Sequence, residues 1–416
     1  MTVLRARVLS PEGPDSVCWL PDARVAFDRD GIIDVSAWTG GTCDEDVREG
    51  HVLVPGFVDT HIHFPQTRIV GEATGPLLTW LQRSTFPEEA RFADPEHANA
   101  VAELFTRALL RAGTTTALVY GSVHADATHS LFRAAERVGI QMLAGPVWMD
   151  EGCPDALRVP TEEAVEAVET LVARWHRPGG RRQVAVIPRF ALSCSAPMLA
   201  AAGALAREHD LFVSTHLAET PDECALAMHR AGTDDYLAVY EAAGLIGPKT
   251  VLAHCIWLSD GEWDRLALAG AAVAHCPDSN AFLGSGGMRL GEALRRHVPI
   301  GLGSDVAAGR SFRIGLAAAH AWDNARRQQV DVDPRRLFWW ATAGGARVLG
   351  LHGSGRLAFA QSADFSLRPM PPWADSEDRV LAQLLFDADA PPPARVWTEG
   401  QLRWQDDGNP WWRVVS

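Results

Sequence analysis

Two histidines close an apolar run near residue 60, where the segment 55–63 reads PGFVDTHIH. Alternate residues of a β-strand point to the same side, so His61 and His63 would project together. Two imidazoles on one side are suited to bind one divalent metal ion. Such a pair is weak evidence alone, because ordinary core and surface histidines also occur at this spacing.

Three further side chains of the right type end later apolar runs: His216, His254 and Asp305. If these runs are parallel strands of one barrel, their carboxyl ends share the face on which barrel enzymes place their active sites. Together with the His61/His63 pair they would supply imidazoles and a carboxylate. That donor set suits a borderline divalent cation, with zinc as the first choice and iron as the alternative. The sequence therefore predicts a metal site.

Glu219 follows His216 by three residues and would lie on the loop over the mouth of such a barrel. A carboxylate near a metal-activated water, without being a ligand, can carry protons. A glutamate on a loop is otherwise usually solvated. His275 also ends an apolar run, and we expect a structural or pocket-shaping role for it, because a sixth ligand would overcrowd one metal. Cys255 and Cys276 directly follow histidines, so we expect their thiols to face the other way and pack.

Several residues near the same ends are candidates for substrate contacts. Arg189 can fork onto a carbonyl or carboxylate of a substrate, although it could instead neutralise a nearby acid. Phe190 can form a wall for a flat ring. Gln66 offers both a donor and an acceptor to the edge of a heterocycle. Trp80 could stack on a ring, but most of the 15 tryptophans must belong to the core.

The elements that must position these residues are short apolar runs alternating with helical patterns. Near-continuous apolar strands separated by helices indicate a parallel sheet. Eight such units over about 300 residues fit a (β/α)8 barrel of the TIM type better than an open sheet. The predicted strands are 52–58, 115–120, 141–148, 183–190, 211–216, 250–255, 271–275 and 300–303.

Helix signals lie between the strands. Asp94-Pro95 and Asp333-Pro334 are typical helix starts, and 259–262 has the pattern of a capping box. Periodicity predicts further helices over 161–175, 197–209 and 315–328, and the helix that opens at Asp333 should end near Gly350.

Both ends of the chain have a β-like pattern. Residues 1–55 alternate in short runs separated by Pro, Gly and Asp, and strands are also predicted at 363–367, 380–386, 395–399 and 401–404. We therefore expect a small flanking β-sandwich formed by both ends. The predicted division is 1–55 and 356–416 for the two parts of this domain, and 56–355 for the barrel.

The composition excludes several classes of protein. The 416 residues carry 38 Lys+Arg against 52 Asp+Glu, a net charge of −14, which argues against nucleic acid as a partner. No phosphate-binding glycine motif is present. Seven cysteines without a C-x-x-C pair do not form a disulfide framework. Without a signal-peptide pattern or an apolar run of about 20 residues, we expect a cytoplasmic protein that does not contact membranes.

Several segments together resemble a known family. They are HIHFPQ at 61–66, WL at 80–81 followed by TFPE at 85–88, RFALSCS at 189–195 and GLGSDV at 301–306. The chain resembles the amidohydrolase superfamily in its mononuclear, metal-dependent deaminase branch, and within it most resembles the guanine deaminases. The similarity runs from about residue 52 to 355. The segments H-C-P-x-S-N at 275–280 and H-x-x-E at 216–219 are shared more widely in the superfamily.

This resemblance implies a metal site with defined roles. One zinc ion per chain would be held by His61, His63, His216 and Asp305. His254 would orient the hydrolytic water and the substrate. Glu219 would be the proton shuttle, and Asp305 would accept a proton as the water is activated.

The resemblance also implies a purine substrate, contacted by Gln66, Arg189, Phe190 and His216. The implied reaction is hydrolytic deamination of guanine to xanthine and ammonia, a step of purine catabolism or salvage, in a cytoplasmic homodimer. Two departures stand out. Asp278 replaces the Asn usual in the H-C-P-N-S-N form, and the segment GRSF at 309–312 differs from the common form.

Three alternatives stay open at this point. A related enzyme could act on another aminated heterocycle, such as 8-oxoguanine, a pterin or a triazine, with the same metal site and a different pocket. An amidohydrolase that opens a cyclic amide would look similar. A metal-binding or assembly protein without catalysis would need neither Glu219 nor Asp305 as a proton carrier.

Overall fold

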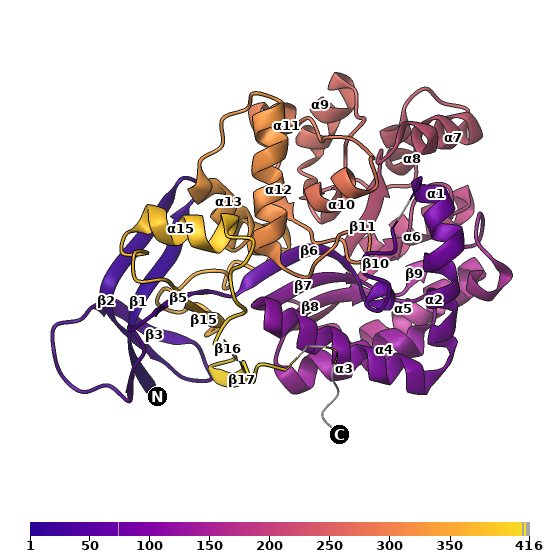
Figure 1. Cartoon of the computed structure of the whole chain (residues 1–416). Helices are drawn as coiled ribbons and strands as arrows, with labels where there is room; N and C mark the ends of the chain where they lie inside the picture. Colours follow the sequence, from indigo (N-terminus) through magenta and orange to yellow (C-terminus); the bar gives the residue numbers. More distant parts are fainter. Residues whose placement is uncertain (74, 410–411, 413–416) are drawn as a thin grey trace.

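The computed structural model describes residues 1–73, 75–409 and 412, and its centre is a parallel barrel (Figure 1). Its strands follow one another around the barrel in chain order, and a short ninth strand, β9 (Val147–Trp148), pairs with the fourth. Nearly every residue of these strands is buried, as expected for a parallel sheet covered on both faces. The predicted (β/α)8 barrel is thus confirmed. Its strands are β6 (Phe57–His63), β7 (Thr114–Tyr120), β8 (Gln141–Gly145), β10 (Arg182–Pro188), β11 (Phe212–Leu217), β12 (Thr250–His254), β13 (Ala272–His275) and β14 (Ile300–Leu302).

The barrel closes between its first and last strands through the segment that follows β14. The backbone N–H of Asp305 donates to the carbonyl of His61 at 2.9 Å, and His63 donates to the carbonyl of Val306 at 3.2 Å. The buried carboxylate of Asp59 accepts from the backbone N–H of Ser304 at 3.0 Å and from its hydroxyl. The closure therefore fixes Asp305 beside the two histidines of β6.

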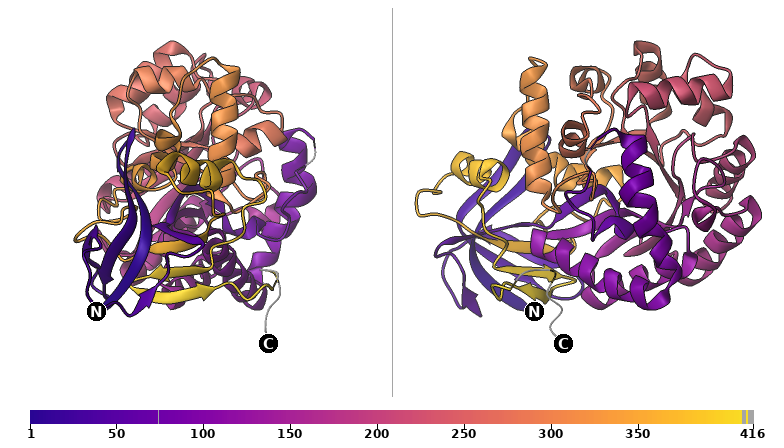
Figure 2. Two further views of the ribbon diagram at one scale, coloured as in Figure 1. Left: turned by 60° about the vertical axis from the view of Figure 1, so that its left-hand side comes forward. Right: turned by 45° about the vertical axis from the view of Figure 1, so that its right-hand side comes forward.

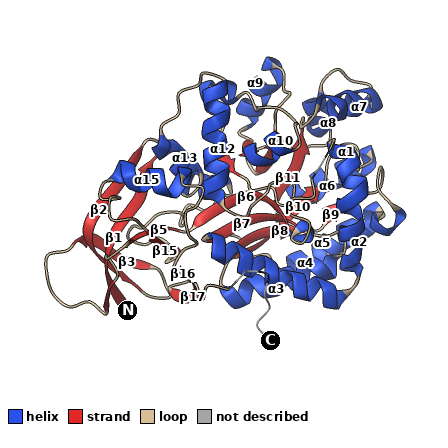
Figure 3. Ribbon diagram, in the orientation of Figure 1, coloured by secondary structure: helices blue, strands red, loops and turns tan. Residues whose placement is uncertain are grey.

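Helices surround the barrel (Figure 3). Asp94 caps α3 and Ser259 forms the predicted capping box with Glu262 at the start of α9. The helices are α1 (Leu77–Trp80), α2 (Phe86–Ala90), α3 (Pro95–Ala112), α4 (Ala125–Val138), α5 (Thr161–Trp175), α6 (Ala196–Glu208), α7 (Pro221–Ala231), α8 (Tyr236–Ala242), α9 (Asp260–Ala269), α10 (Pro277–Phe282), α11 (Leu290–Arg295), α12 (Ile314–Arg327), α13 (Pro334–Trp340), α14 (Ala343–Val348) and α15 (Glu377–Phe386). Short 3-10 turns cover 64–66, 91–93 and 155–157, and a π-turn covers 81–85.

The second sheet joins both ends of the chain, as predicted, and lies beside the barrel in both views of Figure 2. Hydrogen bonds link its strands in the order β17-β16-β15-β5-β1-β2-β3, and β4 pairs with β1. A separate cluster of apolar side chains forms its core. The strands are β1 (Thr2–Gly13), β2 (Ser16–Phe27), β3 (Ile32–Ala37), β4 (Glu45–Asp46), β5 (His51–Pro55), β15 (Phe365–Pro369), β16 (Arg395–Thr398) and β17 (Gln401–Gln405).

The predicted strand 52–58 is two strands in two sheets. β5 pairs with β15 in the small sheet, and β6 begins the barrel two residues later. Gly56 lies between them, and a Cβ atom there would come within 1.9 Å of the Thr115 hydroxyl oxygen. The chain passes from one sheet to the other at a position where only glycine fits.

Two other predictions on the C-terminal side were wrong. The segment 380–386 is not a strand but belongs to α15, whose buried residues Val380, Leu381, Leu384 and Leu385 have helical spacing. The helix that opens at Asp333 ends at Trp340, and α14 begins only after Thr342, whose φ of −136° and ψ of −108° are not helical. Among the described residues, no helix is both long and apolar enough to cross a membrane.

Candidate active site

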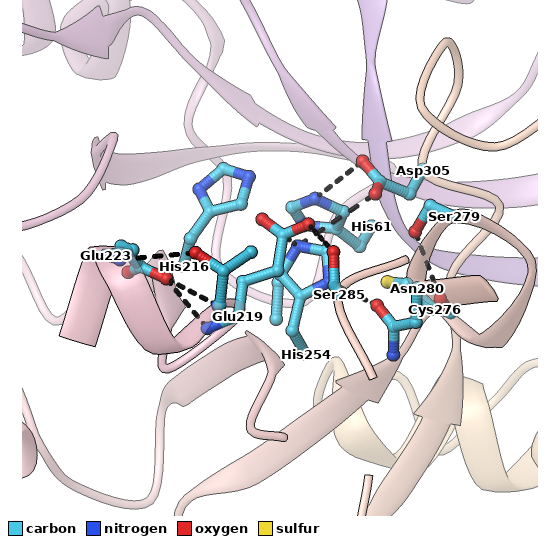
Figure 4. Close-up of polar contacts among 12 residues, drawn as sticks. His61, His216, Glu219, Glu223, His254, Cys276, Ser279, Asn280, Ser285 and Asp305 are labelled. Carbon is cyan, nitrogen blue, oxygen red and sulfur yellow. Dashed lines mark hydrogen bonds and ion pairs between the residues drawn. The ribbon is translucent and has the colours of Figure 1, made fainter. Parts of the chain in front are cut away.

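The five side chains singled out at the strand ends converge in the barrel. His61 and His63 lie on β6. His216 lies on β11, His254 lies at the end of β12, and Asp305 follows β14 (Figure 4). The Nε2 atom of His63 lies 3.2 Å from Nε2 of His61 and 3.2 Å from Nε2 of His216. One carboxylate oxygen of Asp305 lies 3.3 Å from His61 and 3.4 Å from His63.

The ring of His216 presents a lone pair to the other ring nitrogens of the cluster. His216 directs its Nδ1 at the carbonyl oxygen of Arg189 at 2.7 Å, so Nδ1 carries the hydrogen and Nε2 does not. Burial lowers the pKa of His63 to about 3, so this ring is neutral at physiological pH. Despite burial, the neighbouring rings of His61 and His63 hold the pKa of Asp305 well below its ordinary value. Converging lone pairs and a carboxylate are the donor set of a divalent cation.

Further donor atoms lie within reach of the same centre. Nitrogens of His61, His216 and His254 lie within 4.8 Å of one another, as do donor atoms of His61, Cys276 and Asp305. The thiol of Cys276 therefore lies beside the cluster, where we had expected it to point away. Burial raises the pKa of this thiol well above its ordinary value, so it stays protonated.

The backbone is strained at two of these positions. His254 has a φ of 70° and Asp305 a φ of 49°, in the left-handed region that residues with a Cβ atom rarely adopt. Such strain persists where the surrounding structure enforces it, often at functional sites. At both positions it aims a polar side chain at the cluster.

Glu219 and His254 lie together beside the metal-ligand candidates. A carboxylate oxygen of Glu219 is 3.6 Å from Nε2 of His254. The side chain of Asn280 accepts from Nδ1 of His254 at 2.8 Å and sets the orientation of the ring. Burial raises the pKa of Glu219 to about 8, against the effect of a hydrogen bond from Ser285. Glu219 is thus able to hold a proton at neutral pH and to release it.

Two residues that the sequence did not single out hold Glu219 in place. The hydroxyl of Ser285 donates to its carboxylate at 2.9 Å. The carboxylate of Glu223 accepts from the backbone N–H of Glu219 at 2.8 Å and from Tyr236 at 2.7 Å. The T-x-x-E capping box at 220–223 was a readable helix signal, but its contact with Glu219 was not.

A pocket opens next to the cluster, with about 410 Å³ of free space. His63, His216, Glu219, His254 and Asp305 form one side of it. Glu223, apolar side chains and the predicted substrate contacts complete the lining, with Gln66, Leu77, Trp80, Leu81, Arg189, Phe190 and Ala308. The structure thus brings together all the residues predicted for the metal, for proton transfer and for substrate contact. Among them only His61 is not part of the pocket lining, and its Nε2 lies 3.2 Å from Nε2 of His63.

Glu89 organises the polar end of this pocket. Nη1 of Arg189 donates to one of its carboxylate oxygens at 2.7 Å, and the amide of Gln66 donates to the other at 3.2 Å. The Gln66 carbonyl accepts from the backbone N–H of Ala307 at 3.0 Å. Arg189 therefore does neutralise a nearby acid, and it also lines the pocket. Glu89 was not predictable from the sequence, because nothing in its neighbourhood marks a partner 100 residues away.

The remaining candidates lie outside the pocket. His275 is fully buried, and neither of its ring nitrogens has a described partner. The two departures from the family pattern meet each other, because buried Asp278 accepts from the backbone N–H of Arg310 at 2.7 Å and from its guanidinium at 3.0 Å. Arg310 therefore neutralises Asp278 and is not among the residues that line the pocket.

Comparison with known proteins identifies the family of this chain. Residues 52–403 match the model of the amidohydrolase family. Guanine deaminase of Escherichia coli (strain K12) is 40% identical over 341 residues, which are 81% of this chain and 76% of that protein. A probable guanine deaminase of Deinococcus radiodurans is 36% identical over 93% of this chain and 94% of its own length.

A solved structure of guanine deaminase from C. acetobutylicum with bound guanine superimposes with a TM-score of 0.91 at 25% identity, covering 96% of this chain and 99% of that one. The family match spans most of the chain, both relatives exceed 30% identity, and the fold brings four histidines and an aspartate together. This chain is therefore a hydrolytic deaminase of the amidohydrolase family.

Proposed function

We propose that this enzyme converts guanine and water to xanthine and ammonia with a zinc ion in its active site. The observation that carries this proposal is one pocket lined both by the metal-ligand cluster with Glu219 and by Gln66 and Arg189, which are held by Glu89. The relatives named above are guanine deaminases, and one structure holds guanine in its active site.

The proposed ligands of one zinc ion per chain are His61, His63, His216 and Asp305. Their donor atoms lie within 3.2–3.4 Å of each other in the pairs His61–His63, His63–His216, His61–Asp305 and His63–Asp305. Neutral imidazoles and a carboxylate fit zinc, and iron is the alternative. A metal ion bound there supplies the Lewis acidity that activates the hydrolytic water.

The residues of the chain carry the protons. Glu219, whose pKa is raised by burial, donates a proton to a ring nitrogen of the purine and makes the amine-bearing carbon more electrophilic. Asp305 accepts a proton from the attacking water, and His254 orients that water. After the oxygen has bonded to the carbon, Asp305 passes the proton that it took from the water to the amine, the C–N bond breaks and ammonia leaves. The hydroxyl proton of the intermediate returns to Glu219 as the new carbonyl forms, so both carboxyl groups regain their starting states.

The pocket orients the purine. Phe190 and Trp80 offer flat walls for the ring, and His216 forms part of the floor. Arg189 uses one nitrogen for Glu89, and its other N–H groups have no described partner, so they are available to a carbonyl of the substrate. Gln66 is held by Glu89 and Ala307, which fixes the edge that it presents.

Ultraviolet absorbance of the zinc-loaded enzyme mixed with guanine tests the proposal. We expect conversion to xanthine that disappears when a chelator removes the metal. Glu219→Gln should keep its metal, because Glu219 is not a proposed ligand, and lose turnover by about 10²–10⁴-fold. Full activity of Glu219→Gln would contradict the proton-transfer role. Bound zinc without conversion of guanine would reject the substrate and direct the assay to 8-oxoguanine, pterins and triazines.

We also propose, from the family resemblance, that the enzyme is a cytoplasmic homodimer that acts on a small purine and binds neither nucleic acid nor membranes. Sedimentation of the purified enzyme at micromolar concentration should show a species of twice the 45.1 kDa chain mass. A monomer at that concentration would contradict the dimer.

A further inference from the structure

Three arginines gather where the barrel meets the small sheet, away from the active-site pocket. Arg111 lies in the last turn of α3, Arg313 precedes α12, and Arg368 lies on β15. They line two adjoining hollows with about 870 and 930 Å³ of free space. Both hollows share Arg313 and Arg368, and the second includes Arg111.

None of these three guanidinium groups has a described carboxylate within ion-pair distance, although most other arginines in this acidic chain do. Arg368 is only 9% exposed. Its Nε donates to the Ser366 hydroxyl at 3.0 Å and its Nη2 to the Ala112 carbonyl at 2.9 Å. These neutral acceptors fix the group and leave Nη1 without a described partner.

Arg111 and Arg313 do not form an ion pair with a described carboxylate either, although the charges of Asp387 and Asp389 act on Arg313. Arg313 donates to the backbone carbonyls of Ala388 at 2.9 Å and Asp387 at 3.3 Å, not to a carboxylate. Arg111 has no described hydrogen bond, and its Nε is buried without a partner. Two carboxylates, those of Asp387 and Asp389, lie in the lining, and Asp389 is exposed at the rim.

Burial and the neighbouring charge of Arg313 lower the pKa of Arg368 to about 9. Uncompensated cations that repel one another in a buried position are costly, and an anion between them removes that cost. The apolar part of the lining includes Phe57, Met370, Trp373 and Leu384, which suits the organic part of a ligand.

We infer that these hollows form a second binding site, for a small molecule that carries a phosphate group. The guanidinium fork matches phosphate oxygens in pairs, and the two negative charges of phosphate balance several arginines better than one carboxylate does. The aromatic and apolar lining would accommodate the base or sugar of a nucleoside monophosphate. This site is separate from the reaction proposed above and does not depend on it.

Calorimetric titration of the zinc-loaded enzyme tests this inference with three probes: guanosine monophosphate, inorganic phosphate and guanosine. We expect the monophosphate to bind and guanosine to bind at least about tenfold more weakly, because it lacks the phosphate. Inorganic phosphate as tight as the monophosphate would identify free phosphate as the ligand. A tighter monophosphate would identify a phosphate ester, and either result supports the site.

Arg111→Ala and Arg313→Ala should each weaken binding of the monophosphate by about tenfold or more, the effect of losing one charge-assisted hydrogen bond. Arg111→Ala removes no described hydrogen bond, so it should fold normally and keep its deaminase activity. Arg327→Ala, at the exposed other end of α12, is the matched control and should leave binding unchanged. The inference would be overturned if all three variants bound the monophosphate as tightly as the natural enzyme does. It would also be overturned if guanosine bound as tightly as the monophosphate, or if neither phosphate probe bound.

Discussion

The side chain of Arg189 has two roles, one in stability and one in substrate binding, and substitutions can separate them. It neutralises buried Glu89 and, in the proposed complex, contacts a carbonyl of the purine. Arg189→Met should raise KM by about tenfold or more through the lost charge-assisted hydrogen bond. It should also lower the melting temperature, because it leaves the Glu89 carboxylate buried without a cation.

Kinetics and thermal denaturation of Arg189→Met and of the double variant Glu89→Gln/Arg189→Met measure the two effects. The double variant removes the unpaired buried charge, so it should recover melting temperature but not KM. Unchanged KM in both variants would show that Arg189 has only a structural role.

Glu223 makes the stability of the fold depend on pH. Burial raises the pKa of this carboxyl to about 7 from its ordinary 4.5, although three groups donate to it. The folded state therefore holds the proton more tightly than the unfolded state. Protonated Glu223 therefore adds about 3 kcal/mol to the free energy of unfolding. This contribution is fully present below pH 4.5 and is lost as the pH rises through about 7.

Glu223→Gln should remove this dependence, because the amide keeps the shape and does not titrate. The measurement is the difference between the melting temperatures at pH 5 and pH 8, compared between the natural enzyme and the variant. Other titrating groups contribute equally to both proteins. We expect the natural enzyme to lose several degrees more than the variant over this interval, and equal losses would contradict the raised pKa.

At the scale of elements, the packing of α12 on α15 depends on one glycine. A Cβ atom on Gly315 would lie 2.7 Å from the carbonyl oxygen of Leu384 in α15. Gly→Ala within a helix ordinarily stabilises by up to about 1 kcal/mol. Here Gly315→Ala should instead destabilise by about 1–3 kcal/mol, because the two helices must separate.

Gly261→Ala in α9 is the matched control, since the nearest atom to a Cβ there is the end of the Arg265 side chain at 3.9 Å. Thermal denaturation should show a lower melting temperature for Gly315→Ala and an unchanged or higher one for Gly261→Ala. A stabilised Gly315→Ala would mean that α15 does not pack as described.

The alternation of apolar strands and helices was sufficient to predict the barrel from the sequence. Its strands are buried on both faces and read as continuous apolar runs, so their type and order are local properties. The predictions that were wrong concern segments whose structure depends on tertiary contacts. The apolar run around Gly56 is continuous in the sequence, although the chain passes from one sheet to the other there. The short apolar run Val380–Phe386 is compatible with a strand and with the buried face of a helix, and only its packing in the fold distinguishes the two.

The residues of the candidate site also divide into those that the sequence could predict and those that it could not. Residues at strand ends were predictable, because the topology of a parallel barrel brings those ends to one face. The side chains that position them were not. Glu89 reaches Arg189, and Ser285 reaches Glu219, across long stretches of sequence and from helices and loops without a repeated pattern. Side-chain pairing of this kind is set by three-dimensional packing, which a single sequence does not specify.

At the scale of the whole molecule, the active site coincides with the closure of the barrel. Asp59 joins β6 to the segment after β14 through Ser304, and the same segment carries Asp305 to His61 and His63. Burial raises the pKa of Asp59 to about 7, which marks how completely this junction is removed from water. A metal ion held there would connect the first, fifth and last parts of the barrel, so metal binding and stability of the whole fold should be linked.

Removal of the metal should therefore destabilise the entire barrel and not only abolish turnover. A ligand that binds only the folded state stabilises it by about 4 kcal/mol at a concentration a thousand times its Kd. We expect the chelator-treated enzyme to melt well below the zinc-loaded enzyme and to recover on addition of zinc. Glu219→Gln should show the same shift, because Glu219 is not a ligand, whereas His216→Ala should lose most of it. An unchanged melting temperature in protein that elemental analysis shows to be metal-free would mean that the barrel closes without the ion, and that the converging histidines and Asp305 contribute to catalysis alone.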